Sequence, residues 1–339
     1  MANPKDELMH PIKGQSAWSE SYYFNFVDPE SKLAIFTRMG WRPGDGWADA
    51  LHVVYLGGDR VAFTYGRRNI EQDLSQYNGD LSVGHLTLGC EVPFDHWTIK
   101  YAGPAQDIAD AAILLERSKL RPDGWFKAAQ LDMKLDFKAL HLPHYAAAGD
   151  HGHFEQTGAV SGSIKIDDEV FVVNGHGVRD KSWGPRDWGA GTTVSKKPSE
   201  ESSNGTAQKV ADEGPSPFVN WFSMNFGADL AMGGSCFRRA DGQMLGSGWI
   251  QIAGKTEDLK DVAITSEYKA DSILHQSIVL TGTTASGQPI HVDGNVLTIC
   301  PTKIPMPGGA TFINEGLAEF TCAGKIGYGI SEHWHRVSV

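Results

Sequence analysis

The segment 175–188 holds the residues of this sequence that are best suited to acid–base chemistry. Its sequence, GHGVRDKSWGPRDW, contains two Asp, two Arg, two Trp and one His among several glycines. Because glycine lets the backbone bend sharply and approach other groups closely, such a segment can pack charged side chains together. Asp180 is the candidate acid, and a structural corner in which Arg–Asp pairs satisfy a buried turn is the alternative. The segment is not a dinucleotide-binding motif, since Asp180 replaces the third glycine and no helix is predicted after it.

A second group of polar residues precedes this segment. Four histidines and a glutamate lie close together there: His141, His144, His151, His153 and Glu155. A His-x-His pair on a strand points both rings to one face, as metal chelation requires, but no third ligand appears at a familiar spacing. We therefore expect no metal site and no cofactor. His153 and Glu155 are candidates for catalysis beside Asp180, and ordinary turn histidines are the alternative.

Further residues are candidates for substrate binding. Trp183 and Trp221 offer aromatic faces that stabilise a cation, and the charged candidates are Arg179, Asp187 and Glu332. Glu332 lies in the run 327–336, GYGISEHWHR, which also fits an ordinary closing strand. The sequence contains no G-x-S-x-G elbow and no phosphate-binding loop, so acyl and phosphoryl transfer are not indicated.

The elements that position these residues are predicted to be β-strands, because apolar and polar residues alternate along much of the chain. In 131–138 four apolar residues alternate with four charged ones, as in a strand with one wet face. Turn residues at 57–59 and 167–169 predict hairpins over 51–65 and 159–174. A single short helix is predicted within 107–117. Further strands are predicted at 82–90, 96–101, 218–226, 246–252, 262–269, 277–282, 290–299 and 317–332.

The chain is long enough for two domains. Its 339 residues exceed the length at which single hydrophobic cores usually stop growing. The segment 192–217 has almost no large apolar residue, which indicates a linker or a long loop. We expect an N-terminal β domain over 1–191, with both motifs near its end, and a C-terminal β domain over 218–339. Many strands without alternating helices predict an all-β fold of two packed barrels or sandwiches.

Composition limits the partners of the protein. The net charge is −11 and no basic patch stands out, which argues against nucleic acid as a partner. The sequence shows neither an apolar run long enough to span a membrane nor a signal peptide. The four cysteines are dispersed without a C-x-x-C pair, as in reduced proteins of the cytoplasm. We expect a cytoplasmic protein that binds an apolar small molecule; a homodimer is one oligomeric state that the sequence leaves open.

Part of the sequence resembles a known signature. The G-x-G-x-x-D-x-x-W-G pattern of the carotenoid 1,2-hydratases is matched by Gly175, Gly177, Asp180, Trp183 and Gly184. The preceding His153 and Glu155 resemble the histidine-containing motif of those enzymes. More widely, the sequence is similar to the AttH-like group, which includes fungal kievitone hydratase, and in architecture to tocopherol cyclase and the lipocalin-like Diels–Alderases. The resemblance covers 153–188 and, more loosely, 327–332.

This resemblance implies two lipocalin-like domains and a reaction that needs no cofactor. In the hydratases the aspartate of the motif protonates an isolated carbon–carbon double bond, and it corresponds to Asp180; the motif histidine corresponds to His153. Val178 and Glu155 stand where the hydratases have a tyrosine and a tryptophan, which points away from a carotenoid substrate. A carboxylic acid can donate a proton near neutral pH only when burial raises its pKa.

We therefore expect a hydratase, dehydratase or cyclase that acts on an isoprenoid-, steroid- or polyketide-like molecule. Two alternatives share the same fold. A lipid or terpenoid carrier needs only an apolar cavity, and a pericyclase of the Diels–Alderase type needs only shape and hydrogen-bond donors. A titratable group at the cavity wall favours the enzyme.

Overall fold

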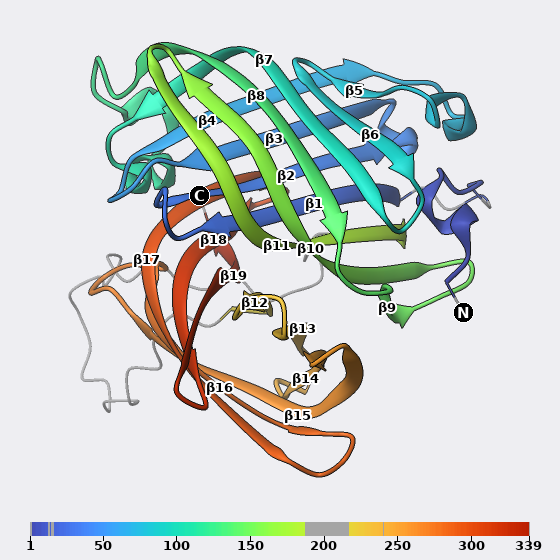
Figure 1. Cartoon of the computed structure of the whole chain (residues 1–339). Helices are drawn as coiled ribbons and strands as arrows, with labels where there is room; N and C mark the ends of the chain where they lie inside the picture. The colour runs from blue at the N-terminus through green and yellow to red at the C-terminus, as the bar shows by residue number, and fades with distance from the viewer. Residues whose placement is uncertain (1, 13, 15–16, 187–216, 240, 339) are drawn as a thin grey trace.

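The computed structural model describes residues 2–12, 14, 17–186, 217–239 and 241–338, and shows an all-β protein of two units (Figure 1). The first unit is a large antiparallel sheet and the second is a closed barrel. Within the described ranges, helical residues occur only as short 3-10 turns: η1 (Pro4–Glu7), η2 (Pro43–Asp45), η3 (Leu74–Tyr77), η4 (Ala111–Leu115) and η5 (Ser118–Leu120). No helix in this part of the chain is long and apolar enough to cross a membrane.

The sheet of the first unit has eleven strands. They are β1 (Trp18–Asp28), β2 (Leu33–Arg42), β3 (Trp47–Tyr55), β4 (Val61–Asn69), β5 (Leu81–Val83), β6 (Leu86–Val92), β7 (His96–Ile108), β8 (Lys127–Ala139), β9 (His144–Ala147), β10 (Gly152–Ile166) and β11 (Glu169–Pro185). The strand order is β4-β3-β2-β1-β11-β10-β8-β7-β6-β5, and β9 pairs with β10. Because β4 also pairs with β7, the sheet curls back on itself around a core of its own.

The barrel of the second unit is made of eight antiparallel strands in chain order. They are β12 (Val219–Asn225), β13 (Leu230–Arg238), β14 (Met244–Ile252), β15 (Lys255–Tyr268), β16 (His275–Thr284), β17 (Pro289–Met306), β18 (Gly309–Cys322) and β19 (Lys325–Ser338). Pairing of β19 with β12 closes the barrel. On β12, Phe222 and Met224 enter the barrel core, whereas Trp221 belongs to an apolar cluster shared with the first unit. Alternation along one strand therefore supplies both the barrel core and the interface.

Strands with one solvent-exposed face follow the predicted alternation of apolar and polar residues. The alternation at 131–138 falls in β8, where Leu131, Met133, Leu135 and Phe137 are buried and the charged residues between them are at least partly exposed. The predicted hairpins correspond to β3–β4 and β10–β11. The expected all-β fold of two lipocalin-like units is confirmed. The linker predicted at 192–217 lies, except for Pro217, outside the described residues, so the domain boundaries at 191 and 218 stay predictions.

Several elements differ from the expectation. The strand predicted at 82–90 is divided between β5 and β6, because Gly84 adopts a positive φ and turns the chain. The strand predicted at 317–332 is a hairpin, in which Ala323 and Gly324 adopt positive φ between β18 and β19. The helix predicted at 107–117 is only the 3-10 turn η4. Strands β1, β2, β9 and β13 had no predicted counterpart.

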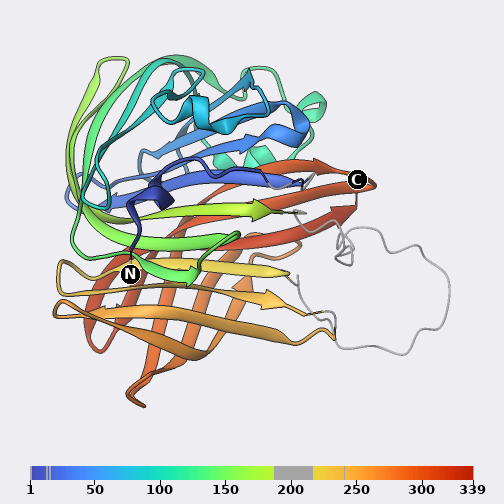
Figure 2. The same ribbon diagram turned by 90° about the vertical axis from the view of Figure 1, so that its right-hand side faces the viewer.

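The two units pack face to face (Figure 2). Side chains of the sheet donate hydrogen bonds directly to side chains of the barrel: Asn25 Nδ2 to Ser223 Oγ at 2.9 Å, and Thr157 Oγ1 to Gln251 Oε1 at 2.8 Å. The Tyr55 hydroxyl donates to the main-chain oxygen of Glu315 at 2.7 Å. Buried polar contacts of this kind fix the orientation of the two faces, because each would leave an unsatisfied group if the faces slid.

Candidate active site

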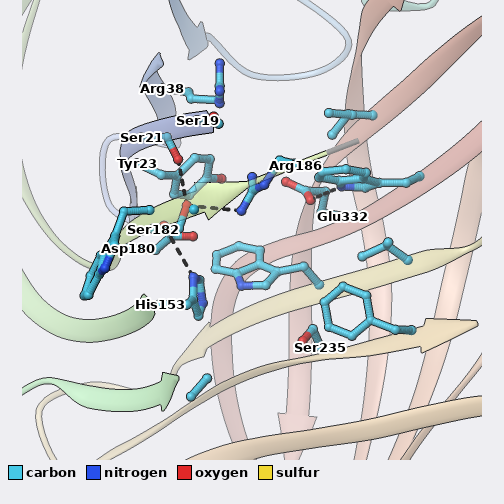
Figure 3. Close-up of a pocket in the computed structure, with 18 of the residues that line it drawn as sticks. Ser19, Ser21, Tyr23, Arg38, His153, Asp180, Ser182, Arg186, Ser235 and Glu332 are labelled. Carbon is cyan, nitrogen blue, oxygen red and sulfur yellow. Dashed lines mark hydrogen bonds and ion pairs between the residues drawn. The ribbon is translucent and has the colours of Figure 1, made fainter. Parts of the chain in front are cut away.

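A cavity of about 560 Å³ lies between the sheet and the barrel. Strands β1, β2, β10 and β11 contribute its sheet wall, and β12, β13, β18 and β19 contribute most of its barrel wall. Aromatic side chains from both units line it: Tyr23, Trp183, Phe218, Trp221, Phe237 and Trp334. The polar groups drawn in Figure 3 project between them. Such a cavity, apolar with a few convergent polar groups, is typical of a small-molecule site.

Strand register brings the motif residues together on the sheet wall. Asp180 of β11 pairs directly with Glu155 of β10 and with Tyr23 of β1, and Ser182 pairs with His153. Since alternate residues of a strand share a face, Asp180 and Ser182 both face the barrel. Two segments that the sequence separates thus form one continuous polar surface.

Asp180 is a carboxyl group without a hydrogen-bond partner at one oxygen. Its Oδ1 is buried and, among the described residues, accepts no hydrogen bond. His153 approaches it, with Nδ1 3.9 Å from Oδ1. Burial raises the pKa of Asp180, although His153 opposes this effect. The group is therefore disposed to hold a proton and to present it to the cavity.

His153 and Glu155 form an ion pair beside this acid. His153 Nε2 lies 3.1 Å from Glu155 Oε1, and the indole nitrogens of Trp221 and Trp249 donate to Glu155 at 2.6 and 2.5 Å. Burial alone would raise the pKa of Glu155, but these partners lower it. Burial would lower the pKa of His153, but Asp180 and Glu155 raise it. The two charges neutralise each other, so that burial dominates at Asp180.

Glu155 does not line the cavity itself. Its oxygens are occupied by one imidazole and two indoles, and the indoles come from the barrel. The structure therefore brings Glu155 into contact with His153 and with both units, while only His153 and Asp180 of this trio reach the cavity.

Arg179 lies on the opposite side of the sheet from Asp180, as strand alternation predicts. Its guanidinium forms a bidentate pair with Glu7, at 2.6 and 2.9 Å, and donates from Nε to Gln156 at 2.8 Å. The side chain is 1% exposed. Arg179 packs into the core of the first unit and does not line the cavity. We therefore no longer expect Arg179 to bind substrate.

Of the candidates Trp183, Trp221 and Asp187, two line the cavity and one lies outside the described residues. Trp183 and Trp221 line the cavity. Trp183 is held in place by a stacked His10 ring at 4.0 Å and by donation to the main-chain oxygen of Gly149. Asp187 lies outside the described residues. Two lining residues that the sequence analysis did not select are Arg38 and Arg186.

The barrel wall carries a second pair of carboxyl groups. Glu332 lines the cavity as expected, and it pairs across strands with Glu315, which the sequence analysis missed. The Tyr23 hydroxyl donates to Glu315 Oε2 at 3.0 Å, and the Trp334 indole donates to Glu332. Burial and the neighbouring carboxyl raise the pKa of Glu315, and burial raises that of Glu332. The available signal was a glutamate at position 315 in the predominantly apolar run 310–318.

The described residues contain no group of three or more His, Cys, Asp or Glu arranged to hold a metal ion. The four histidines and Glu155 of the predicted cluster do not converge on one point. His144 instead contacts Asp258 of the barrel at 2.9 Å, and His153 contacts Glu155 and Asp180.

Comparison with known proteins gives a family and a fold. The sequence matches, over residues 3–337, the family described as a domain of unknown function, DUF7064. No curated protein matches it.

Solved structures of similar fold extend over nearly the whole chain. A Nitrosomonas europaea protein assigned as AttH covers 98% of this chain and 100% of its own, with a TM-score of 0.58 and 12% identity. CghA, solved with Sch210972, covers 95% and 89%, with a TM-score of 0.56 and 11% identity. Kievitone hydratase from Nectria haematococca covers 96% and 94%, with a TM-score of 0.52 and 10% identity. The chain therefore shares the fold of these three solved proteins.

Proposed function

We propose that this chain, which belongs to the DUF7064 family, is a hydratase or dehydratase that needs no cofactor. Its substrate is an apolar isoprenoid-, steroid- or polyketide-like molecule with an alkene or an alcohol. The observation that carries the proposal is the partly buried Asp180 carboxyl, which lines the cavity and whose buried Oδ1 lacks a hydrogen-bond partner among the described residues. The solved kievitone hydratase of the same fold is consistent with this class of reaction.

The chemistry requires an acid strong enough to protonate an alkene. In the hydration direction, Asp180 donates its proton to one alkene carbon, and the neighbouring carbon becomes a cation. The face of Trp221 stabilises that cation, whereas the ring of Trp183 packs against His10 in the core of the first unit. Water then attacks it and releases one proton, which completes the alcohol. Dehydration runs through the same steps in reverse, and capture of the cation by a second group of the substrate would be a cyclisation.

His153 and Glu155 have positioning roles in this proposal. Glu155 accepts from both barrel indoles and holds His153 in place, so that the imidazolium lies 3.9 Å from Asp180. After proton transfer Asp180 is a carboxylate, and the adjacent imidazolium stabilises its charge. The pair thereby lowers the energy of the charged state, while burial raises the pKa of Asp180.

A carrier or a pericyclase is the second candidate, because the fold also occurs in CghA, which was solved with Sch210972. Either function needs the cavity and not the acid. Asp180→Asn separates the candidates, since it keeps the size of the side chain and removes its proton.

The experiment uses the purified protein and an apolar metabolite extract from cells that carry it, incubated in ¹⁸O-labelled water. Mass spectrometry should find a compound that gains labelled water or one that loses water. Asp180→Asn should lower this turnover by about 10²–10⁴-fold, while Asp132→Asn, an exposed aspartate of β8, should not. Equal turnover by folded Asp180→Asn would refute the catalytic assignment. Binding of a compound without any labelling would favour the carrier.

A further inference from the structure

Proton donation by Asp180 does not involve the Glu315–Glu332 pair, which is a separate polar feature of the cavity. Both carboxyls line the cavity, and both belong to β18 and β19 of the barrel, whereas Asp180 belongs to β11 of the sheet. In Figure 3, Asp180 and Glu332 lie on either side of Arg186. A molecule in the cavity is thus flanked by one carboxyl group on the sheet wall and two on the barrel wall.

The pair is arranged to share a proton. Glu315 and Glu332 are directly opposite each other on neighbouring strands, and their carboxyls hydrogen-bond. The remaining hydrogen bonds come from donors: Tyr23 to Glu315, and Trp334 to Glu332. Two adjacent buried carboxyls cannot both ionise, so one proton stays between them. Burial raises the pKa of Glu332, and the hydrogen bonds from Glu315 and Trp334 and the nearby Arg186 oppose this effect. With Glu315 carrying the shared proton, Glu332 is the member of the pair that can accept another.

The surroundings of the pair indicate that the cavity is built to take a polar group. Ser19 lines the same cavity and is only 5% exposed, yet its hydroxyl has no hydrogen-bond partner in the described structure. Asp180 Oδ1 is in the same situation. Buried polar atoms normally have hydrogen-bond partners, so we expect these two atoms to bond to a polar group of a ligand or to water.

We propose that the Glu315–Glu332 pair is the second proton-transfer group of the reaction. This inference rests on the proposed hydratase function. During hydration the Asp180 proton goes to one alkene carbon, and a water oxygen bonds to the other carbon. The proton that this water loses goes to Glu332, so that Asp180 ends as a carboxylate and the pair ends with two protons. During dehydration the pair protonates the leaving hydroxyl, and Asp180 takes the proton from carbon.

A stereochemical consequence follows from the positions of the two groups. The proton comes from the sheet wall, and the water is activated at the barrel wall. The hydrogen and the hydroxyl are therefore added to opposite faces of the double bond. The substrate class is narrowed to molecules whose alkene or alcohol can lie between Asp180 and Glu332.

Isotope labelling with the metabolite extract tests this division of roles. In D₂O containing ¹⁸O-water, the wild type should produce an alcohol with deuterium and labelled oxygen on opposite faces. Glu332→Gln should lower ¹⁸O incorporation by about 10²-fold or more, yet still exchange deuterium into recovered alkene, because the acid step persists. Asp180→Asn should lose both labels. Glu319→Gln, a glutamate of β18 that hydrogen-bonds Tyr328 and does not line the cavity, should match the wild type.

The outcomes separate the two proposals. Normal ¹⁸O incorporation by Glu332→Gln, or addition to a single face, would overturn the role of the pair and leave the hydratase function standing. Absence of any label with the wild type would overturn both. Isotope-edited infrared spectroscopy gives a measurement that does not depend on turnover: folded wild type at pH 7–8 should show a protonated glutamic acid that Glu315→Gln removes. If the signal of that protonated glutamic acid is missing, the proposed role of the Glu315–Glu332 pair is also refuted.

Discussion

The histidines inside the barrel should make the protein lose stability in mild acid. His275, His333 and His335 are each 0% exposed, and the rings of His275 and His333 stack with their centroids 3.7 Å apart. Burial, followed by the neighbouring positive charges, lowers the pKa of His275 and of His335 to about 3 and that of His333 well below its usual value. All three are therefore neutral in the folded protein at pH 5.

The magnitude follows from proton linkage. In the unfolded chain these histidines have pKa values of about 6.5, so at pH 5 the unfolded state binds protons that the folded state does not. Each histidine then lowers the free energy of unfolding by about 2 kcal/mol relative to pH 7.5, and the three together by about 6 kcal/mol. Since domains are stable by about 5–15 kcal/mol, this is a large share. The loss begins as the pH falls through 6.5 and continues toward 3.

Urea unfolding at pH 7.5 and pH 5 measures this effect. His335→Gln removes one titrating group whose ring nitrogens have no hydrogen-bond partner among the described residues. Its loss of stability between the two pH values should be smaller than that of the wild type by about 2 kcal/mol. His291→Gln, at an exposed position of β17, should behave as the wild type. An identical pH dependence in His335→Gln and wild type would refute the reasoning.

Three further substitutions test the packing around the site. Glu7→Gln should cost about 3–5 kcal/mol in urea unfolding, because it leaves Arg179 as an uncompensated buried charge. Gly177→Ala should lower the melting temperature strongly, since its Cβ would lie 1.8 Å from the main-chain oxygen of Asn25, which the sheet holds in place. Glu155→Gln should lower the pKa of His153, measured by NMR titration, because it removes one of the two carboxylates that raise that pKa. No change in any of these measurements would contradict the contacts described here.

Sequence patterns predicted the strands that have one wet face and one buried face. The alternation in 131–138 and the turn residues at 167–169 are local signals, and β8 and the β10–β11 hairpin follow them. The same patterns did not reveal β1, because every one of its residues is buried. This strand contacts the core of the sheet with one face and the barrel with the other, so both faces tolerate apolar residues and the period-2 contrast disappears.

The sequence by itself determined the all-β character and the placement of Asp180 and Arg179 on opposite faces of a strand. These properties depend on residue type and on the two-residue period of a strand. Only the tertiary structure decided which residues meet Asp180. Strand register places His153 and Glu155 beside it, and packing of the barrel against the sheet brings in Trp221, Glu315 and Glu332. Contacts between strands far apart in the chain leave no local pattern, because they depend on how the two faces fit together.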